Sequence, residues 1–247
     1  MKTLIIIPAR YASARLPGKP LADIKGKPMI QHVYERAAQG FSNVYVATED
    51  TRIDTAVKNF GGRCLMTSET HPSGTDRCAE ALEKAEEQTG EIFDIIINLQ
   101  GDEPLIEYKQ LKQPEQILKQ PQTQIATLIK RIKNTNDLFD TGQPKAVVDA
   151  RQNALYFSRT ALPFVRDAEK KEWLQKHIFY KHIGLYAYKR EILHEIVKLP
   201  SSPLELAEKL EQNRWLEHGY KIKCAETPYE NFSIDTKNDL KKINRMI

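Results

Sequence analysis

Three basic side chains gather in the loop that follows the first hydrophobic run of the chain. The run "TLIIIP" leads into "ARYASARLPGKP", which contributes Arg10, Arg15 and Lys19. Guanidinium and ammonium groups bind phosphate oxygens, and a glycine with two prolines can shape a backbone nest for an anion. The segment matches neither a Walker motif nor G-x-G-x-x-G, which argues against a standard ATPase or dinucleotide enzyme. It predicts a phosphate site of another kind, with a solvated basic loop as the alternative.

A second candidate phosphate segment, "HPSGTDR", follows the third strand-like run. Main-chain amides and hydroxyls at the start of a helix are suited to bind phosphate, and a nearby arginine adds positive charge. The side chains and backbone that would do so belong to Ser73, Gly74, Thr75 and Arg77.

An acidic turn, "NLQGDEP", follows the fourth strand-like run. Gly101 allows a sharp turn, after which Asp102 emerges where a carboxylate can hold a magnesium ion beside phosphates. The neighbouring Glu103 would support this site or be purely structural. A well-made loop without a ligand is the alternative for this turn.

The elements that must position these segments alternate between strand and helix. Short β-rich runs cover residues 4–8, 43–48, 63–67 and 93–99, and amphipathic helical patterns separate them over 28–40, 50–62 and 75–90. Alternation of this kind is typical of βαβ units and a parallel sheet with helices on both faces. Ligands of such sheets bind beyond the carboxyl ends of the strands, where the candidate segments lie.

After Asp102 the alternation becomes looser. Strand-like runs cover residues 123–132, 144–150, 153–159, 182–189 and 220–226, and helices are expected over 201–219 and 236–247. We therefore predict an α/β fold with a doubly wound, mostly parallel Rossmann-like sheet and a smaller excursion of mixed strands. Residues 1–247 are expected to form a single domain, with a nucleotide-binding half over about 1–102 and a second half over about 103–247.

Composition excludes several classes of protein. The 247 residues include 40% hydrophobic residues, enough for a sizeable core, and 37 basic against 33 acidic side chains leave only +4. This charge is too small and too evenly spread for a nucleic-acid binder. No run approaches a membrane span and no leader is visible, which predicts a cytoplasmic protein. Cys64, Cys78 and Cys224 lack the spacing of a disulfide framework or zinc site.

Seven segments together resemble the 3-deoxy-manno-octulosonate (Kdo) cytidylyltransferase family, the CMP-Kdo synthetases, and they span the chain nearly end to end. They are "IIPARYASARLPGKPL", "HPSGTDR", "NLQGDEPLI", "LYFSR", "YKHIGLYAY", "SPLELAEKLEQNRWLEHGYKI" and "SIDTKNDL". The resemblance implies a nucleotide-diphospho-sugar transferase fold and an enzyme that converts CTP and Kdo to CMP-Kdo and pyrophosphate. It also implies Mg²⁺ as cofactor, a role in lipopolysaccharide synthesis, and a homodimer.

The resemblance further implies roles for individual residues on the nucleotide side. Asp102 and Asp235 match two magnesium carboxylates, and with Arg10 and Lys19 they form the expected catalytic set. The expected CTP-binding residues are Arg10, Arg15, Lys19, Ser73, Gly74, Thr75, Arg77 and Gln100.

The sugar pocket is likewise implied by the resemblance. Its expected residues are Gln100, Arg159, His182, Tyr186, Glu211 and Gln212. A guanidinium suits the carboxylate of a sugar acid, and the imidazole, phenol and carboxylate suit its hydroxyls. Taken alone, His182 and Tyr186 would more often be core residues, and Glu211 would be an ordinary residue at the boundary of a helix.

Three other functions remain open from the sequence. The same reaction on the 8-amino analogue of Kdo shares most of these motifs, and a sialic-acid cytidylyltransferase would use the same chemistry on another sugar acid. A non-catalytic nucleotide-sugar binding module is disfavoured, because both Asp102 and Asp235 are present. Fine substrate preference is left open by local departures from the family pattern at Lys181, "NRWLEHG" and Lys145.

Overall fold

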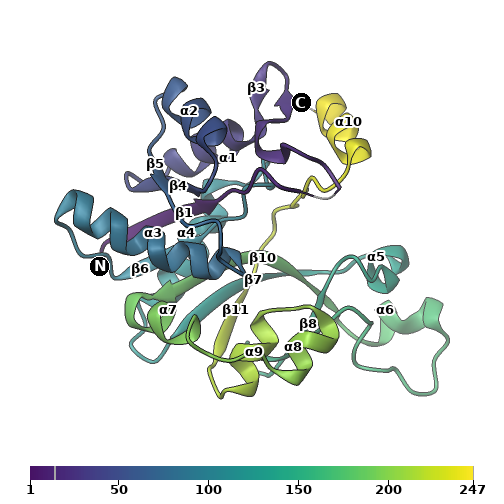
Figure 1. Cartoon of the computed structure of the whole chain (residues 1–247). Coiled ribbons are helices and arrows are strands. Elements are labelled where there is room, and N and C mark those ends of the chain that lie inside the picture. The colour runs from purple at the N-terminus through teal and green to yellow at the C-terminus, as the bar shows by residue number, and fades with distance from the viewer. Residues whose placement is uncertain (14, 247) are drawn as a thin grey trace.

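The protein is built around one large mixed sheet, which is described by a computed structural model over residues 1–13 and 15–246. Within these residues nine strands form the sheet, and the main order is β11-β7-β10-β6-β1-β4-β5 (Figure 1). The strands are β1 (Thr3–Pro8), β4 (Val44–Thr48), β5 (Cys64–Met66), β6 (Ile95–Asn98), β7 (Ile125–Arg131), β8 (Lys145–Val148), β9 (Ala154–Ser158), β10 (Tyr180–Lys189) and β11 (Ile222–Glu226). A separate hairpin joins β2 (Asp23–Ile24) and β3 (Lys27–Pro28).

Helices cover both faces of the sheet. One face packs against α1 (Met29–Ala38), α2 (Thr51–Asn59) and α4 (Tyr108–Leu118). The other packs against α3 (Gly74–Thr89), α7 (Arg190–Ile196) and α9 (Gln212–Glu217). Buried side chains of β1 serve both faces, with Ile5 and Ile7 on the first and Leu4 and Ile6 on the second. The strand is therefore hydrophobic at every position rather than at alternate ones.

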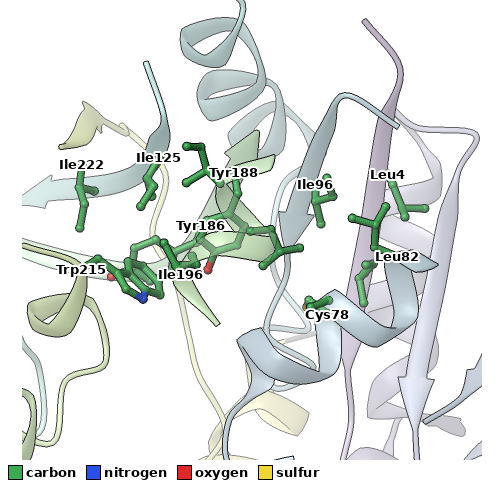
Figure 2. Close-up of a cluster of buried hydrophobic side chains, with 14 of the residues drawn as sticks. Leu4, Cys78, Leu82, Ile96, Ile125, Tyr186, Tyr188, Ile196, Trp215 and Ile222 are labelled. Atoms are coloured by element: carbon green, nitrogen blue, oxygen red, sulfur yellow. The ribbon is translucent and has the colours of Figure 1, made fainter. Parts of the chain in front are cut away.

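The core on the second face joins the early and late parts of the chain. Figure 2 shows Leu4 and Leu82 of the early part in the same cluster as Tyr188, Trp215 and other late residues. The Trp215 ring stands edge-on to Tyr188, with 5.6 Å between ring centroids. This continuous packing makes the two parts of the chain neighbours around a shared core.

The doubly wound architecture expected for the early part is confirmed. β1 pairs in parallel with both β4 and β6, and β5 pairs in parallel with β4. Ser73 caps α3 by accepting hydrogen bonds from the amides of Thr75 and Asp76, and Gly90 ends it with a left-handed φ of 67°. A glycine adopts this φ without the strain that a Cβ would cause.

The late part contains the expected excursion of mixed strands. β10 runs antiparallel between β6 and β7, and β8 pairs antiparallel with both β10 and β9. Helices α4 and α7 were not predicted. The prediction of one helix over 201–219 is wrong, because Lys209 adopts a left-handed φ of 53° that separates α8 (Pro203–Glu208) from α9. The break turns Leu210 into the core.

Shorter elements complete the late part and the loops. They are η1 (Lys19–Leu21), α5 (Thr135–Phe139), η2 (Lys170–Glu172) and α6 (Trp173–Lys176). The three cysteines, Cys64, Cys78 and Cys224, are free as expected. Among the described helices, each is too short or too polar to cross a lipid bilayer.

The final segment of the chain returns to the early part. After β11 it crosses the sheet edge and ends in α10 (Lys237–Met246), which lies beside the β2–β3 hairpin (Figure 1). Ile234 and Ile243 pack with Ile24 and Met29 in a small core. The amide of Ile234 donates to the carbonyl of Asp102 at 3.0 Å, which fixes the next residue, Asp235, beside the acidic turn.

Candidate active site

Two cavities meet at the carboxyl ends of β1 and β6. The larger cavity has a volume of about 310 Å³, and the smaller cavity about 220 Å³. Gln100 and Asp102 line both. Predicted site residues also lining the larger cavity are Gly74, Thr75, His182, Tyr186, Glu211 and Gln212, and those lining the smaller cavity are Arg10 and Lys19. The geometry thus forms two adjoining compartments with Gln100 and Asp102 at their junction.

Lys19 joins the two aspartates that the sequence keeps far apart. Its Nζ lies 2.5 Å from Asp102 Oδ2 and 3.2 Å from Asp235 Oδ1. Burial opposes the charge of Lys19, but the attraction and hydrogen bonds of both carboxylates outweigh it and raise its pKa. The Arg15 guanidinium lies 3.2 Å from Asp235 Oδ1 at the exposed edge of the site. Asp102 and Asp235 are therefore brought together around a positive charge.

The residues present fit a magnesium ion. Carboxylate oxygens are the ligands that magnesium prefers, and it commonly uses one or two of them together with waters and ligand phosphates. The ammonium group of Lys19 shows that Asp102 and Asp235 can approach one cation from two sides. Among the described residues no group of three or more His, Cys, Asp or Glu forms a closed cage. Asp102 and Asp235 would thus leave ligand positions open for a substrate.

Glu103, beside Asp102, supports the segment that carries Asp235. Burial raises the pKa of Glu103 to about 8, with the charge of Asp102 adding to the effect. Asn231 Nδ2 donates to Glu103 Oε2 at 3.3 Å, and Gln110 Nε2 donates to Asn231 Oδ1 at 2.7 Å. This chain of polar contacts holds the returning segment against the acidic turn.

The start of α3 forms one wall of the larger cavity. Ser73 Oγ and Thr75 Oγ1 donate to the two oxygens of Glu211 at 2.7 Å each. Glu211 also lies 3.2 Å from Arg214 Nη2. Burial raises the pKa of Glu211 despite these partners. The carboxylate thereby ties the turn before α9 to the first turn of α3.

The floor of the larger cavity consists of side chains from β10 and α9. Burial lowers the pKa of His182 to about 3, so its imidazole is neutral, and Nε2 lies 3.1 Å from Thr127 Oγ1. Within the described chain, the Tyr186 hydroxyl and Gln212 Nε2 are buried without a hydrogen-bond partner. Unpaired buried polar atoms are costly, and these two lie at a cavity where a polar ligand would satisfy them.

Comparison with known proteins identifies the family. A family model described as "Cytidylyltransferase" matches residues 4–222. The 3-deoxy-manno-octulosonate cytidylyltransferases of Parabacteroides distasonis and Bacteroides thetaiotaomicron are 52% and 53% identical, each covering 98% of this chain and 96% of the relative.

This chain belongs to the 3-deoxy-manno-octulosonate cytidylyltransferase family. A solved structure of CMP:2-keto-3-deoxy-manno-octonic acid synthetase complexed with CTP is 44% identical, with a TM-score of 0.90 over 100% of this chain and 98% of that one. A cytidylyltransferase from Leptospira borgpetersenii, 20% identical with a TM-score of 0.60, shares the fold. The predicted fold class is thus confirmed.

Five predicted site residues of this cytidylyltransferase do not line the cavities: Arg15, Ser73 and Asp235 lie beside residues that do, whereas Arg77 and Arg159 are held elsewhere. Arg77 is fully buried, with Nη1 2.6 Å from Thr67 Oγ1 and Nη2 2.7 Å from Glu49 Oε2. The Arg159 guanidinium donates to the carbonyls of Glu208 and Thr141 at 2.8 and 3.3 Å, and to a third carbonyl at 3.4 Å. Their side chains suit anions, but in this structure their partners are protein oxygens.

Several residues near the cytidylyltransferase site were missed from the sequence. Gly184 and Ser233 line the larger cavity, and Tyr11 lies between the predicted basic residues of the first loop. Gly184 and Ser233 are uncharged, and their spacing in the sequence does not indicate a binding site. Tyr11 offered one signal, because it is an aromatic residue within a loop of small and basic residues.

Proposed function

We propose that this enzyme transfers CMP from CTP to the anomeric hydroxyl of Kdo, releasing pyrophosphate. The observation that carries the proposal is the convergence of two aspartates on Lys19: Asp102, which lines both cavities, and Asp235, which reaches the same ammonium group. The relatives described above are named 3-deoxy-manno-octulosonate cytidylyltransferases, and the chain matches them over nearly its full length. We assign the smaller cavity to the triphosphate and the larger to the sugar acid.

The basic residues of the first loop would bind the triphosphate. Arg10 and Lys19 line the smaller cavity, and Arg15 lies at its exposed edge. Their charges would stabilise the negative charge that develops on departing pyrophosphate. Ser73, Gly74 and Thr75 lie at the start of α3, where amides and the helix dipole favour an anionic ligand.

Asp102 and Asp235 would hold Mg²⁺ in the complex with substrates. When bound there, the ion would supply a Lewis acid that lowers the pKa of the sugar hydroxyl and aligns it with the α-phosphorus. Gln100 would contact both substrates, which its position in the lining of both cavities supports. Holding the two reactants in register accounts for much of the rate of such a transfer.

The sugar hydroxyls would be bound by the polar floor of the larger cavity. Tyr186 and Gln212 offer the unpaired hydroxyl and amide, and neutral His182 can donate or accept according to its tautomer. Glu211 would orient this wall through its contacts with α3. Arg159 would reach the sugar carboxylate only if its guanidinium left the carbonyls that hold it now.

Pyrophosphate release tests the proposal. The protein is incubated with CTP, Mg²⁺ and each member of a sugar-acid panel containing Kdo, its 8-amino analogue and a sialic acid. We expect Kdo to give the highest kcat/KM, and Asp102→Asn to lower turnover about a thousandfold while the circular dichroism spectrum stays unchanged. Normal turnover by Asp102→Asn, or a clear preference for another acid, would contradict the assignment.

We also infer a homodimer and a cytoplasmic location for the enzyme. Exposed apolar side chains of the late part support the first inference, with Leu155 60%, Phe164 73% and Leu206 53% exposed. Such side chains are suited to an interface between subunits. We propose that residues 1–102 serve the nucleotide and residues 103–247 the sugar and the dimer. Light scattering at several concentrations measures the oligomeric state.

A further inference from the structure

Tyr11 and Gly18 contact each other within the first loop. They are the sequence neighbours of the two basic residues that line the smaller cavity. The Gly18 amide donates to the Tyr11 carbonyl at 3.1 Å. Gly18 has a left-handed φ of 69°, and a Cβ there would lie 3.1 to 3.3 Å from atoms of the Tyr11 ring. The ring therefore packs closely against the Gly18 backbone. Arg10 immediately precedes Tyr11, and Lys19 immediately follows Gly18. The contact therefore positions the backbone that carries both basic side chains.

One face of the Tyr11 ring is covered by Arg52. The Arg52 guanidinium lies 3.3 Å from the ring centroid. Asp50 holds that guanidinium, with its carboxylate oxygens 2.9 Å from Nε and 2.6 Å from Nη2. A cation held over an aromatic face is attracted to it and fixes its plane. Tyr11 thus contacts both the first turn of α2 and the Gly18 backbone.

The main-chain amide of Tyr11 is bound by Glu49, which is paired with the buried Arg77. The amide donates to Glu49 Oε1 at 3.3 Å, and the other oxygen of Glu49 lies 2.7 Å from Arg77 Nη2. Arg77 is fully buried and also donates to Thr67, so it is held against the residues that follow β4 and β5. Arg77 is therefore linked to the main chain of Tyr11 through Glu49.

We propose that Tyr11, Glu49, Arg52 and Arg77 form a brace that positions Arg10 and Lys19 for the triphosphate. The inference rests on the proposed function, since it assigns the smaller cavity to phosphate. In the brace, Arg77 is a positioning residue and makes no contact with nucleotide. Arg52 is also a positioning residue. Its guanidinium is attracted to the Tyr11 ring, and the ring packs against the backbone of the first loop.

The brace predicts that CTP affinity depends on an exposed arginine outside both cavities. The side chain of Arg52 is 58% exposed, so Arg52→Gln should leave the thermal unfolding midpoint unchanged. Loss of the cation over the ring should raise the KM for CTP about five- to tenfold, with kcat and the KM for Kdo within twofold of wild type. Arg52→Lys should recover most of the CTP affinity.

Changes to Tyr11 itself separate the ring from its hydroxyl. Tyr11→Leu removes the aromatic face and should weaken CTP binding at least as much as Arg52→Gln. Tyr11→Phe keeps the face and should stay closer to wild type than Tyr11→Leu. The inhibition constant of inorganic triphosphate should rise in parallel with the KM for CTP, because the brace acts on the residues that bind phosphate.

A matched control lies at the opposite end of the strands, away from the first loop. Lys112 lies 3.7 Å from the Phe41 ring centroid and pairs with nearby Glu115 at 3.2 Å, as Arg52 pairs with Asp50. Lys112→Gln removes a cation from an aromatic face without touching the first loop. Its KM for CTP should equal that of wild type.

Calorimetric titration with CTP in the absence of sugar distinguishes failure of the brace from failure of the proposed function. Weaker CTP binding by Arg52→Gln and Tyr11→Leu, but not by Lys112→Gln, supports the brace even if Kdo is not the acceptor. Unchanged CTP binding by both Arg52→Gln and Tyr11→Leu overturns it. A parallel rise of both KM values with a lower unfolding midpoint also overturns it, because that pattern shows a general structural effect.

Discussion

Lys19 and Lys145 are both held by oxygen atoms, but the origin of those oxygens differs. Lys19 lies between the side chains of Asp102 and Asp235 and lines the smaller cavity. Lys145 is fully buried, and its Nζ donates to the carbonyls of Asp140, Gln143 and Arg159 at 2.5, 2.8 and 3.0 Å. The carboxylates around Lys19 raise its pKa, whereas burial lowers that of Lys145.

This difference separates a reactive site from a structural one. Carboxylates beside a cavity can exchange one cation for another, so under the proposed function Lys19 would change partners when substrates bind. Main-chain carbonyls are fixed by the fold, and the ammonium group of Lys145, which is removed from water, needs the three that accept from it. We therefore expect Lys19 to matter for activity and Lys145 for stability.

The largest expected effect is on activity, from Lys19→Met. Loss of the ammonium removes a charge that stabilises the triphosphate, so kcat/KM for CTP should fall about a hundred- to a thousandfold. The urea midpoint should change little, because the aspartates can be solvated from the cavity. Steady-state kinetics and urea unfolding measure the two effects. A large loss of stability with little loss of activity would remove the distinction between the two lysines.

The second prediction reverses these effects at Lys145. Lys145→Met keeps a similar volume but removes the buried ammonium group that three carbonyls share. The Asp140 carbonyl keeps the Gln143 amide as a donor at 3.2 Å, whereas those of Gln143 and Arg159 lose the lysine, which should lower the free energy of unfolding by about 3 kcal/mol. Urea unfolding measures the loss. The control is Lys171→Met, which removes an exposed lysine paired with Glu169 and should cost less than about 0.5 kcal/mol. Equal urea midpoints for the two variants would show that the carbonyls find other donors.

The smallest expected effect is on the pH dependence of stability, through the buried neutral imidazole of His182. The folded pKa of His182 is about 3, below its ordinary value of 6.5, so folding favours the neutral form. Its stabilising contribution is complete above pH 6.5 and is lost as the pH falls toward 3. Between pH 7.5 and 5, the wild type should lose about 2 kcal/mol more than His182→Gln.

Urea unfolding at the two pH values measures this difference. His177, whose ring is exposed, provides the control, and His177→Gln should follow the wild type. Parallel loss of stability by wild type and His182→Gln would show that the buried imidazole does not govern this pH range.

The sequence predicted the early part of the fold well because its signals are local. The runs that became β1, β4, β5 and β6 are hydrophobic and are separated by amphipathic helices, so periodicity was sufficient. The break within residues 201–219 gave no such signal, because a lysine rather than a glycine adopts the left-handed conformation at Lys209. Placement of β10 between β6 and β7 depends on pairing between distant segments and was equally hidden.

The site was predictable in chemistry more than in placement. Asp102 could be expected at a sheet edge from its position after a strand, and the resemblance supplied Asp235, but only the return of the final segment brings them together. Arg77 and Arg159 have side chains suited to anions, yet Glu49 and several carbonyls hold them. Which oxygen a guanidinium finds is decided by tertiary contacts that no local pattern encodes.

The position of Asp235 just before α10 has a consequence for synthesis of the protein. A ribosome that has completed β11 has supplied every strand of the large sheet, so most of the core can already assemble. Asp235, the second proposed magnesium ligand, is still missing at that stage. Under the proposed function, a chain terminated just after β11 would therefore be folded in most of its sheet yet chemically inert.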